Sequence, residues 1–176
     1  MELRNKLQIE ADEPEKERNI RYLTFWTDQR LFGIPIAEVV QIIGIQNKIT
    51  CLPDQPAYIK GLISLRGQII PVIDVRSRFG CPEEDYNERT CIIITRVSDS
   101  DFGLIVDEVD EVIDILPEQI SPLPKFNADK VNHSFLTGIG QLSTNSTQPE
   151  RIVLILHVAR ILPEEEFTSL TEATHS

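Results

Sequence analysis

The chain has 176 residues and a mass of 20.0 kDa, which suits one domain or two small ones and allows a real hydrophobic core. A composition of 41% hydrophobic and 26% charged residues excludes wholesale disorder, a collagen-like rod and a disulfide scaffold. The formal charge of −11 leaves no basic excess of the kind that nucleic-acid-binding domains carry, so we expect no nucleic-acid partner.

Much of the acidity lies at the two ends of the chain. Residues 1–18 hold six acidic and four basic residues, and residues 163–176 hold four acidic residues and no basic one. We interpret 1–19 as a flexible arm and 163–176 as a solubilising acidic tail that could form a C-terminal helix. The first residues lack the apolar stretch of a secretory signal, and no window is long and apolar enough to span a bilayer. We therefore expect a cytoplasmic protein with reduced cysteines.

Apolar runs of four to eight residues, rich in Val and Ile, follow one another between residues 20 and 162 and predict a mainly β fold. Glycine, proline, aspartate or serine breaks each run. In chain order the expected strands are Tyr22–Thr27, Arg30–Ile36, Gln41–Ile45, Gly61–Leu65, Gln68–Ile73, Thr90–Arg96, Phe102–Val109, Val112–Leu116, Thr137–Leu142 and Arg151–His157.

Turns and short helices connect these strands. The two-residue gaps Asp28-Gln29 and Arg66-Gly67 predict tight hairpins. One short helix is expected at Val75–Phe79, between Asp74 as its N-cap and Gly80 as its stop, and another at Val158–Leu162.

A motif of the first half returns in the second half about 70 residues later. The sequence FGIPIAEV at Phe32–Val39 is echoed by FGLIVDEV at Phe102–Val109, a Leu-Pro dipeptide recurs, and the hairpin that begins at Gly61 is echoed from Gly138. The repeat predicts one domain, residues 20–162, made of two halves at approximately 20–80 and 88–162. Five strands in each half suit a small closed barrel, because closure removes exposed sheet edges.

Enzyme signatures are missing from the chain. The histidines are His133, His157 and His175, and no catalytic or nucleotide-binding motif accompanies them. His157 ends an apolar run, where a helix cap or a hydrogen-bonded strand end is the favoured interpretation over a ligand or a base. We expect no enzyme activity, no catalytic residue and no cofactor.

A cluster of five acidic residues is a candidate site for a divalent cation, because hard cations bind carboxylate oxygens. Its spacing lacks the glycine turn and the terminal glutamate of a calcium loop, and apolar residues alternate with it as on a strand with one wet face. We therefore expect a solvated face and no metal ion. The cluster consists of Asp107, Glu108, Asp110, Glu111 and Asp114.

The segment GLISLRGQIIPVIDVR, which begins at Gly61, stands out from the rest of the chain. Two apolar strands flank a turn in which Arg66 cannot be buried without a partner, while Gly67 suits a positive φ. Arg66 is then either a solvated turn residue or, beside a groove, an interface anchor, because arginine is enriched at binding hot spots.

This segment closely resembles the signature of the CheW family, the coupling proteins of bacterial chemosensory arrays. The resemblance extends from Tyr22 to Leu162 and includes FGIPIAEVVQIIG, ERTCIIIT, FGLIVDEVDEVI and RIVLILHVARIL. It implies two five-stranded SH3-like barrels related by pseudo-two-fold symmetry. It also implies a non-enzymatic adaptor that joins the cytoplasmic tips of methyl-accepting chemoreceptors to the regulatory domain of the histidine kinase CheA, and that meets the membrane only through the receptors.

The resemblance also implies two sets of contact residues. Apolar members of the first set would hold a receptor hairpin helix, and Arg66 would fix its register. The expected receptor-binding residues are Val39, Val40, Gln41, Ile42, Leu65, Arg66 and Gly67. The expected kinase-binding residues are Lys125, Phe126, Ile69 and Ile70.

Several positions depart from the family's usual residues and concern the choice of partner. They are Ser64, Gln41, Ile43, Ser121 and Lys125. Charge pairs set specificity more than affinity. These departures therefore leave the adaptor role intact, but they leave open which receptors and which array the protein serves. Alternatives are an adaptor of a non-flagellar array, such as one governing type IV pili or surface sensing, and a decoy that binds the kinase without receptors.

Overall fold

The computed structural model describes residues 20–45, 48–124, 135–142 and 150–161. Within these ranges the chain is mainly β, with eleven strands, one short α-helix and three 3-10 helices. The expected N-terminal arm and C-terminal helix both lie outside the described residues.

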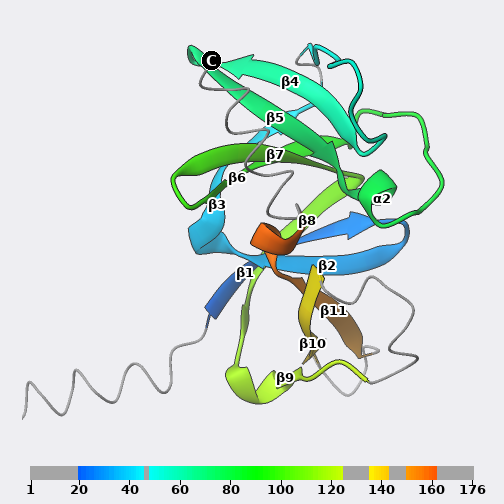
Figure 1. The fold of residues 1–176 in the computed structure, drawn as a ribbon. Helices are drawn as coiled ribbons and strands as arrows, with labels where there is room; N and C mark the ends of the chain where they lie inside the picture. Colours follow the sequence, from blue (N-terminus) through cyan, green and yellow to red (C-terminus); the bar gives the residue numbers. More distant parts are fainter. Residues whose placement is uncertain (1–19, 46–47, 125–134, 143–149, 162–176) are drawn as a thin grey trace, which may run out of the picture.

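Two sheets form the molecule, and Figure 1 shows them as an upper and a lower layer. The lower, six-stranded sheet has the order β8-β1-β2-β11-β10-β9, and the upper, five-stranded sheet has the order β3-β6-β7-β5-β4. The strands of the six-stranded sheet are β1 (Ile20–Thr27), β2 (Arg30–Pro35), β8 (Glu108–Ile115), β9 (Ile120–Ser121), β10 (Leu136–Leu142) and β11 (Arg151–Leu156). Those of the five-stranded sheet are β3 (Val39–Gly44), β4 (Ile59–Leu65), β5 (Gln68–Asp74), β6 (Cys91–Val97) and β7 (Ser100–Val106). The expectation of five strands in each sheet is therefore met once, and β9 adds a sixth strand to the other sheet.

The helical segments are short and lie where strands end. They are η1 (Ile36–Glu38), α2 (Val75–Arg78), η2 (Pro117–Gln119) and η4 (Val158–Arg160). Asp74 caps α2 as predicted, because its carboxylate accepts a hydrogen bond from the Ser77 backbone N–H at 3.3 Å. The second expected helix is the 3-10 helix η4, and Leu162 lies outside the described residues.

The two halves of the chain exchange hairpins. The β1–β2 hairpin of the first half pairs with β8 and β11 of the second half, and the β6–β7 hairpin of the second half pairs with β3 and β5 of the first. The sequence boundaries 20–80 and 88–162 therefore do not delimit the two sheets. An internal repeat shows that two segments have similar strands, but it carries no information about which copy pairs with which.

The repeated Phe-Gly dipeptide occupies equivalent places in the two sheets. Gly33 of β2 lies opposite Ile155 in a parallel pair, and Gly103 of β7 lies opposite Val72 in the other parallel pair. A Cβ atom at Gly103 would lie 2.7 Å from the Ile92 side chain, which is closer than side-chain contacts allow. The glycine is thus kept by close packing at the centre of each sheet.

Three hydrophobic clusters hold this arrangement together. One contains side chains of the six-stranded sheet, one contains side chains of the five-stranded sheet, and the third, which we call the inter-sheet core, contains side chains of both sheets. Four phenylalanine rings run through it, with centroid separations of 5.3–5.8 Å between Phe25, Phe32, Phe79 and Phe135. The two sheets therefore share one core and behave as a single folding unit.

Several strand boundaries differ from the sequence-based expectation by one to four residues, and the difference at Asp107 changes which sheet the chain belongs to. The expected strand Phe102–Val109 is interrupted at Asp107, where the chain leaves the five-stranded sheet as β7 and enters the six-stranded sheet as β8. The Asp107 backbone N–H donates to the Trp26 carbonyl at 3.0 Å, and its carboxylate binds Arg76. The apolar pattern continues through this crossing, so hydrophobicity alone could not locate it.

Candidate functional site

The β4–β5 hairpin ends in a turn that presents Arg66. Leu65 pairs with Gln68, so Arg66 and Gly67 form a two-residue turn with φ angles of 52° and 79°. Positive φ at both central residues is typical of a type I′ turn, which favours asparagine or glycine over arginine. Arg66 is exposed, and among the described residues its guanidinium has no hydrogen bond or ion pair.

The flanks of this hairpin differ sharply in burial. Ile69 is 51% exposed and lies opposite the exposed Ser64 on the outer face of the hairpin. Ile70 is 2% exposed and packs inside the barrel, with Leu65 partly buried against the same cluster. Ile70 therefore presents no side chain at the surface of this structure, unlike its neighbour Ile69, because successive residues of a strand point to opposite faces.

Strand β3 offers a second apolar surface. Val40 and Ile42 are 46% and 41% exposed, whereas Val39 and Gln41 are half-buried. Ile42 pairs with Ile93, a member of the inter-sheet core, so its side chain lies on the face of the sheet that meets the other sheet. β3 is an edge strand, and of its residues Val39 packs against the inter-sheet core while Val40 and Ile42 are exposed.

Strands β3 and β4 lie at opposite edges of the five-stranded sheet, and a backbone bridge joins the segment after β3 to β4. Thr50, which follows β3, exchanges two backbone hydrogen bonds of 2.8 Å with Leu62 of β4. Ile43 and Leu65 pack against the same interior cluster. Among the described residues, no hydrogen bond or ion pair joins the β3 candidates to the hairpin tip. Of the predicted kinase contacts, Lys125 and Phe126 lie outside the described residues.

Glu38 of η1 lies directly before the β3 surface. Its Oε2 atom is buried and has no hydrogen-bond partner among the described residues. Burial raises the pKa of this carboxyl, and the nearby His157 lowers it in part. The chain therefore keeps a poorly solvated acid beside Val39 and Val40.

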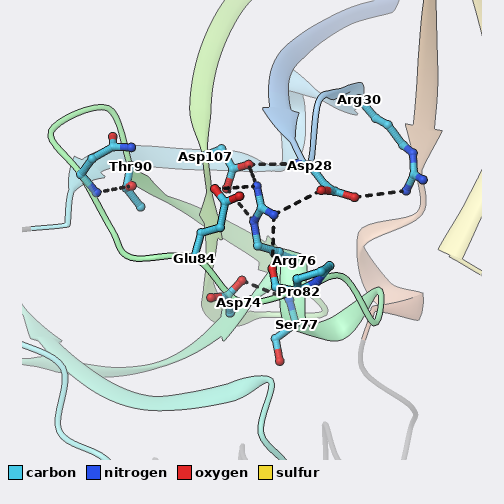
Figure 2. A network of polar contacts seen from close by, with 10 residues as sticks. Asp28, Arg30, Asp74, Arg76, Ser77, Pro82, Glu84, Thr90 and Asp107 are labelled. Carbon is cyan, nitrogen blue, oxygen red and sulfur yellow. Dashed lines mark hydrogen bonds and ion pairs between the residues drawn. The ribbon is translucent and has the colours of Figure 1, made fainter.

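A polar network around Arg76 ties the two sheets together (Figure 2). The Arg76 side chain is only 8% exposed and donates to the carboxylates of Asp107 and Asp28, with Glu84 at 3.4 Å and the Pro82 carbonyl at 3.2 Å. Asp28 belongs to the β1–β2 turn, whereas Arg76 belongs to α2 beside the other sheet. The hydrogen bond that the guanidinium donates to Asp107 raises the pKa of Arg76, so Arg76 remains a fixed positive charge at the junction.

The sequence missed this network because its members lie far apart in the chain. We expect Asp107 to lie on a solvated acidic face, but four of the five acids of that face make ion pairs with arginines. The ion pairs made by its acids are Arg76–Asp107, Arg151–Asp110 at 2.9 Å, Arg151–Glu111 at 3.2 Å and Arg21–Asp114 at 3.2 Å. Alternating charge on a strand indicated exposure, but no local signal indicated the distant arginines.

The described ranges contain no group of three or more His, Cys, Asp or Glu residues that could hold a metal ion. His157 is exposed at the N-cap position of η4, where its backbone N–H donates to the Phe135 carbonyl at 2.7 Å and its side chain makes no cap bond. None of the helices in the described part of the chain is long and apolar enough to cross a membrane. The surfaces around Arg66, Val40 and Ile42 present a guanidinium and exposed aliphatic side chains, which suit contact with another protein.

Comparisons with known proteins agree with a binding module of this kind. A family model described as a CheW-like domain matches residues 21–166. The chemotaxis protein CheW of Klebsiella aerogenes is 32% identical over 155 residues, which cover 88% of this chain and 89% of that protein. The crystal structure of the scaffolding protein TtCheW from Thermoanaerobacter tengcongensis superposes with a TM-score of 0.69 at 32% identity, covering 80% of this chain and 90% of that one.

The chain therefore belongs to the CheW-like family, the non-enzymatic scaffold proteins of chemotaxis signalling. A shorter match of 29% identity, over 53% of this chain and 54% of the relative, is to the protein PilI of Pseudomonas aeruginosa.

Proposed function

We propose that this scaffold couples the cytoplasmic tips of methyl-accepting chemoreceptors to the regulatory domain of a CheA-type histidine kinase, in an array at the cytoplasmic side of the membrane. An adaptor of this kind controls a kinase only if its contacts differ in free energy between the active and the inactive assembly. Its contact residues, and not a reactive group, therefore carry the function.

The observation that carries the proposal is the state of Arg66. Arg66 is an exposed arginine held at the strained φ of 52°, and its guanidinium has no partner among the residues that the structure describes. Five rigid N–H donors suit a carboxylate or a row of carbonyl groups on a docked segment. We assign Arg66 to the receptor, with Leu65 and Gly67 shaping the turn that presents it.

The apolar part of the receptor contact would come from β3. Val40 and Ile42 provide exposed aliphatic side chains, and Val39 and Gln41 lie between the surface and the interior. An amphipathic helix buries its apolar face in such a surface and leaves polar residues at the rim. Burial of two aliphatic side chains stabilises a complex by roughly 2–4 kcal/mol before the costs of association.

Kinase binding is proposed at the opposite flank of the β4–β5 hairpin and on the second half of the chain. Ile69 is the exposed candidate, and Lys125 and Phe126 stay predictions on the sequence alone. Separate receptor and kinase surfaces would allow one molecule to hold both partners together.

The identity of the array is a second question. The departures at Ser64, Gln41 and Ile43 change the polar groups beside the proposed receptor surface, and the match to PilI is to a relative with another name. These observations favour an adaptor of a non-flagellar array as the alternative. A decoy that binds the kinase alone would lower array activity as its concentration rises.

The test replaces Arg66 by glutamate and measures the affinity for receptor fragments and for the kinase separately. We expect receptor affinity to fall by about tenfold or more, as for a lost hot-spot arginine, and kinase affinity to stay within about twofold. Arg89→Glu is the matched control, because Arg89 is also exposed and its side chain is outside the proposed contacts. Unchanged receptor affinity in the Arg66 variant would show that Arg66 is merely a turn residue.

A further inference from the structure

The β4–β5 hairpin is a cationic segment in an acidic protein. Its residues 59–74 contain Lys60, Arg66 and one acid, Asp74, a net charge of +1, whereas the whole chain carries a formal charge of −11. Lys60 has a partner in Glu83 at 2.7 Å. Arg66 has no such partner among the described residues, so its guanidinium could form ion pairs with an acidic segment of the chain.

An apolar strip leads along this hairpin from the inter-sheet core to the exposed tip. Alternate residues of β5 share one face, and on that face Ile73 is 0% exposed, Pro71 is buried and Ile69 is 51% exposed. On β4, the half-buried Leu62 lies opposite Pro71. The strip is therefore covered at its base and uncovered at its tip.

The described part of the chain ends at the base of the same strip. Ile161 is 0% exposed in the inter-sheet core, as is Ile73, and its carbonyl accepts a hydrogen bond from Arg78. Arg78 ends α2, the helix that directly follows β5. Ile161, the last described residue, thus lies beside the start of the strip.

The composition and length of the remaining residues fit this surface. Residues 163–176 carry Glu164, Glu165, Glu166 and Glu172 and no Lys or Arg, and Phe167 and Leu170 have the spacing of one helix face. β5 has seven residues and spans about 20 Å. The fifteen residues after Ile161 reach about 22 Å as a helix and about 50 Å when extended, so either form reaches the tip.

We propose that the acidic tail, residues 163–176, docks along the outer face of the β4–β5 hairpin, with its carboxylates beside Arg66 and its apolar residues against Ile69. The consequence rests on the proposed function: a tail that pairs with Arg66 competes with the receptor for the same guanidinium, and a tail that covers Ile69 competes with the kinase for that side chain. The tail is then a built-in competitor that a receptor must displace.

The experiment uses NMR spectra of the full-length, isotope-labelled chain without any partner. In an Arg66→Gln variant we expect the amide signals of residues 164–172 to shift toward those of an unattached peptide, and in a variant with all four tail glutamates replaced by glutamine we expect the signals of Ser64, Gly67 and Ile69 to shift. The matched control Arg89→Gln should leave the tail signals in place. Raising the salt concentration should reproduce the effect of Arg66→Gln, because exposed ion pairs are screened.

The two proposals fail in different ways. Tail signals that do not respond to Arg66→Gln, or that respond equally to Arg89→Gln, would overturn the docking without any bearing on receptor binding. A second measurement compares receptor affinity of the wild type and the tail variant, where competition predicts a gain of about threefold, the size expected from one exposed ion pair. Equal receptor affinities would overturn the competition.

Discussion

Arg66 combines an unfavourable backbone conformation with a guanidinium that binds no partner within the described part of the chain. A non-glycine residue at φ 52° costs of order 1 kcal/mol relative to a residue that tolerates the left-handed region. Neither packing nor an ion pair among the described residues offsets this cost. At the scale of one residue, the turn is therefore less stable than it would be with asparagine or glycine, and it exposes a guanidinium. A loss of stability of this kind is typical of residues kept for binding.

Replacing Arg66 by asparagine tests whether the arginine lowers the stability of the turn and serves receptor binding. Asparagine tolerates the first central position of a type I′ turn, so we expect Arg66→Asn to raise the free energy of unfolding by about 0.5–1 kcal/mol. Denaturant unfolding measures the change, and receptor affinity should fall in the same variant. A lower stability would mean that the arginine makes contacts that stabilise the fold.

The polar junction around Arg76 acts between structural elements. It joins α2, the β1–β2 turn and the crossing from β7 to β8, which belong to different sheets. A nearly buried guanidinium that satisfies several acceptors fixes geometry even where its net contribution to stability is modest. We assign it the relative placement of the two sheets, and with them of the β3 surface and the β4–β5 hairpin.

Replacing Arg76 by methionine leaves Asp28 and Asp107 without their shared partner. We expect a loss of about 2 kcal/mol in the free energy of unfolding, below the value for fully buried pairs because both carboxylates are partly exposed. Arg151→Met is the matched control, since Arg151 also binds two acids, Asp110 and Glu111, but within one sheet. Chemical shifts across the inter-sheet core should change only in the Arg76 variant. Equal spectral changes in both variants would contradict a role in placing the sheets.

Gly61 controls closure of the five-stranded sheet. It has a φ of 141°, and a Cβ atom there would lie 2.0 Å from the carbonyl oxygen of Thr50, whose backbone pairs with Leu62. We expect Gly61→Ala to destabilise the protein by about 3 kcal/mol or more. Gly44→Ala serves as the control, because a Cβ at Gly44 meets nothing within 4 Å. Similar melting temperatures for the two variants would refute this account of closure.

At the scale of the whole molecule, the internal repeat makes β3 and β8 equivalent edge strands of the two sheets, but the residues on these two strands differ in charge. Val112 of β8 pairs with Leu23 as Ile42 of β3 pairs with Ile93, and Val112 is 48% exposed. The neighbours of Val112 are the acids of β8, whereas those of Ile42 are uncharged. The repeat thus supplies two similar edge strands. The acids of β8 make that edge unsuitable for an apolar helix, whereas the uncharged edge of β3 suits one.

The sequence predicted most strands, both hairpin turns, the Asp74 cap and the repeat, because alternation and turn residues are local signals. It could not predict the exchange of hairpins or the crossing at Asp107, because these depend on pairing between distant segments. Among the site residues, Val40, Ile42, Arg66 and Ile69 are exposed as a binding surface requires, whereas Ile70 is not. Its burial follows from strand alternation at the hairpin, which the resemblance did not take into account.

The most direct test of the adaptor role is receptor control of kinase activity in a reconstituted array. Cognate receptors and kinase are combined with and without the chain, and autophosphorylation of the kinase is measured with and without an attractant. We predict that receptor control requires the chain, persists with Arg89→Glu and is largely lost with Arg66→Glu. Receptor control that is the same in the absence of the chain would contradict the account.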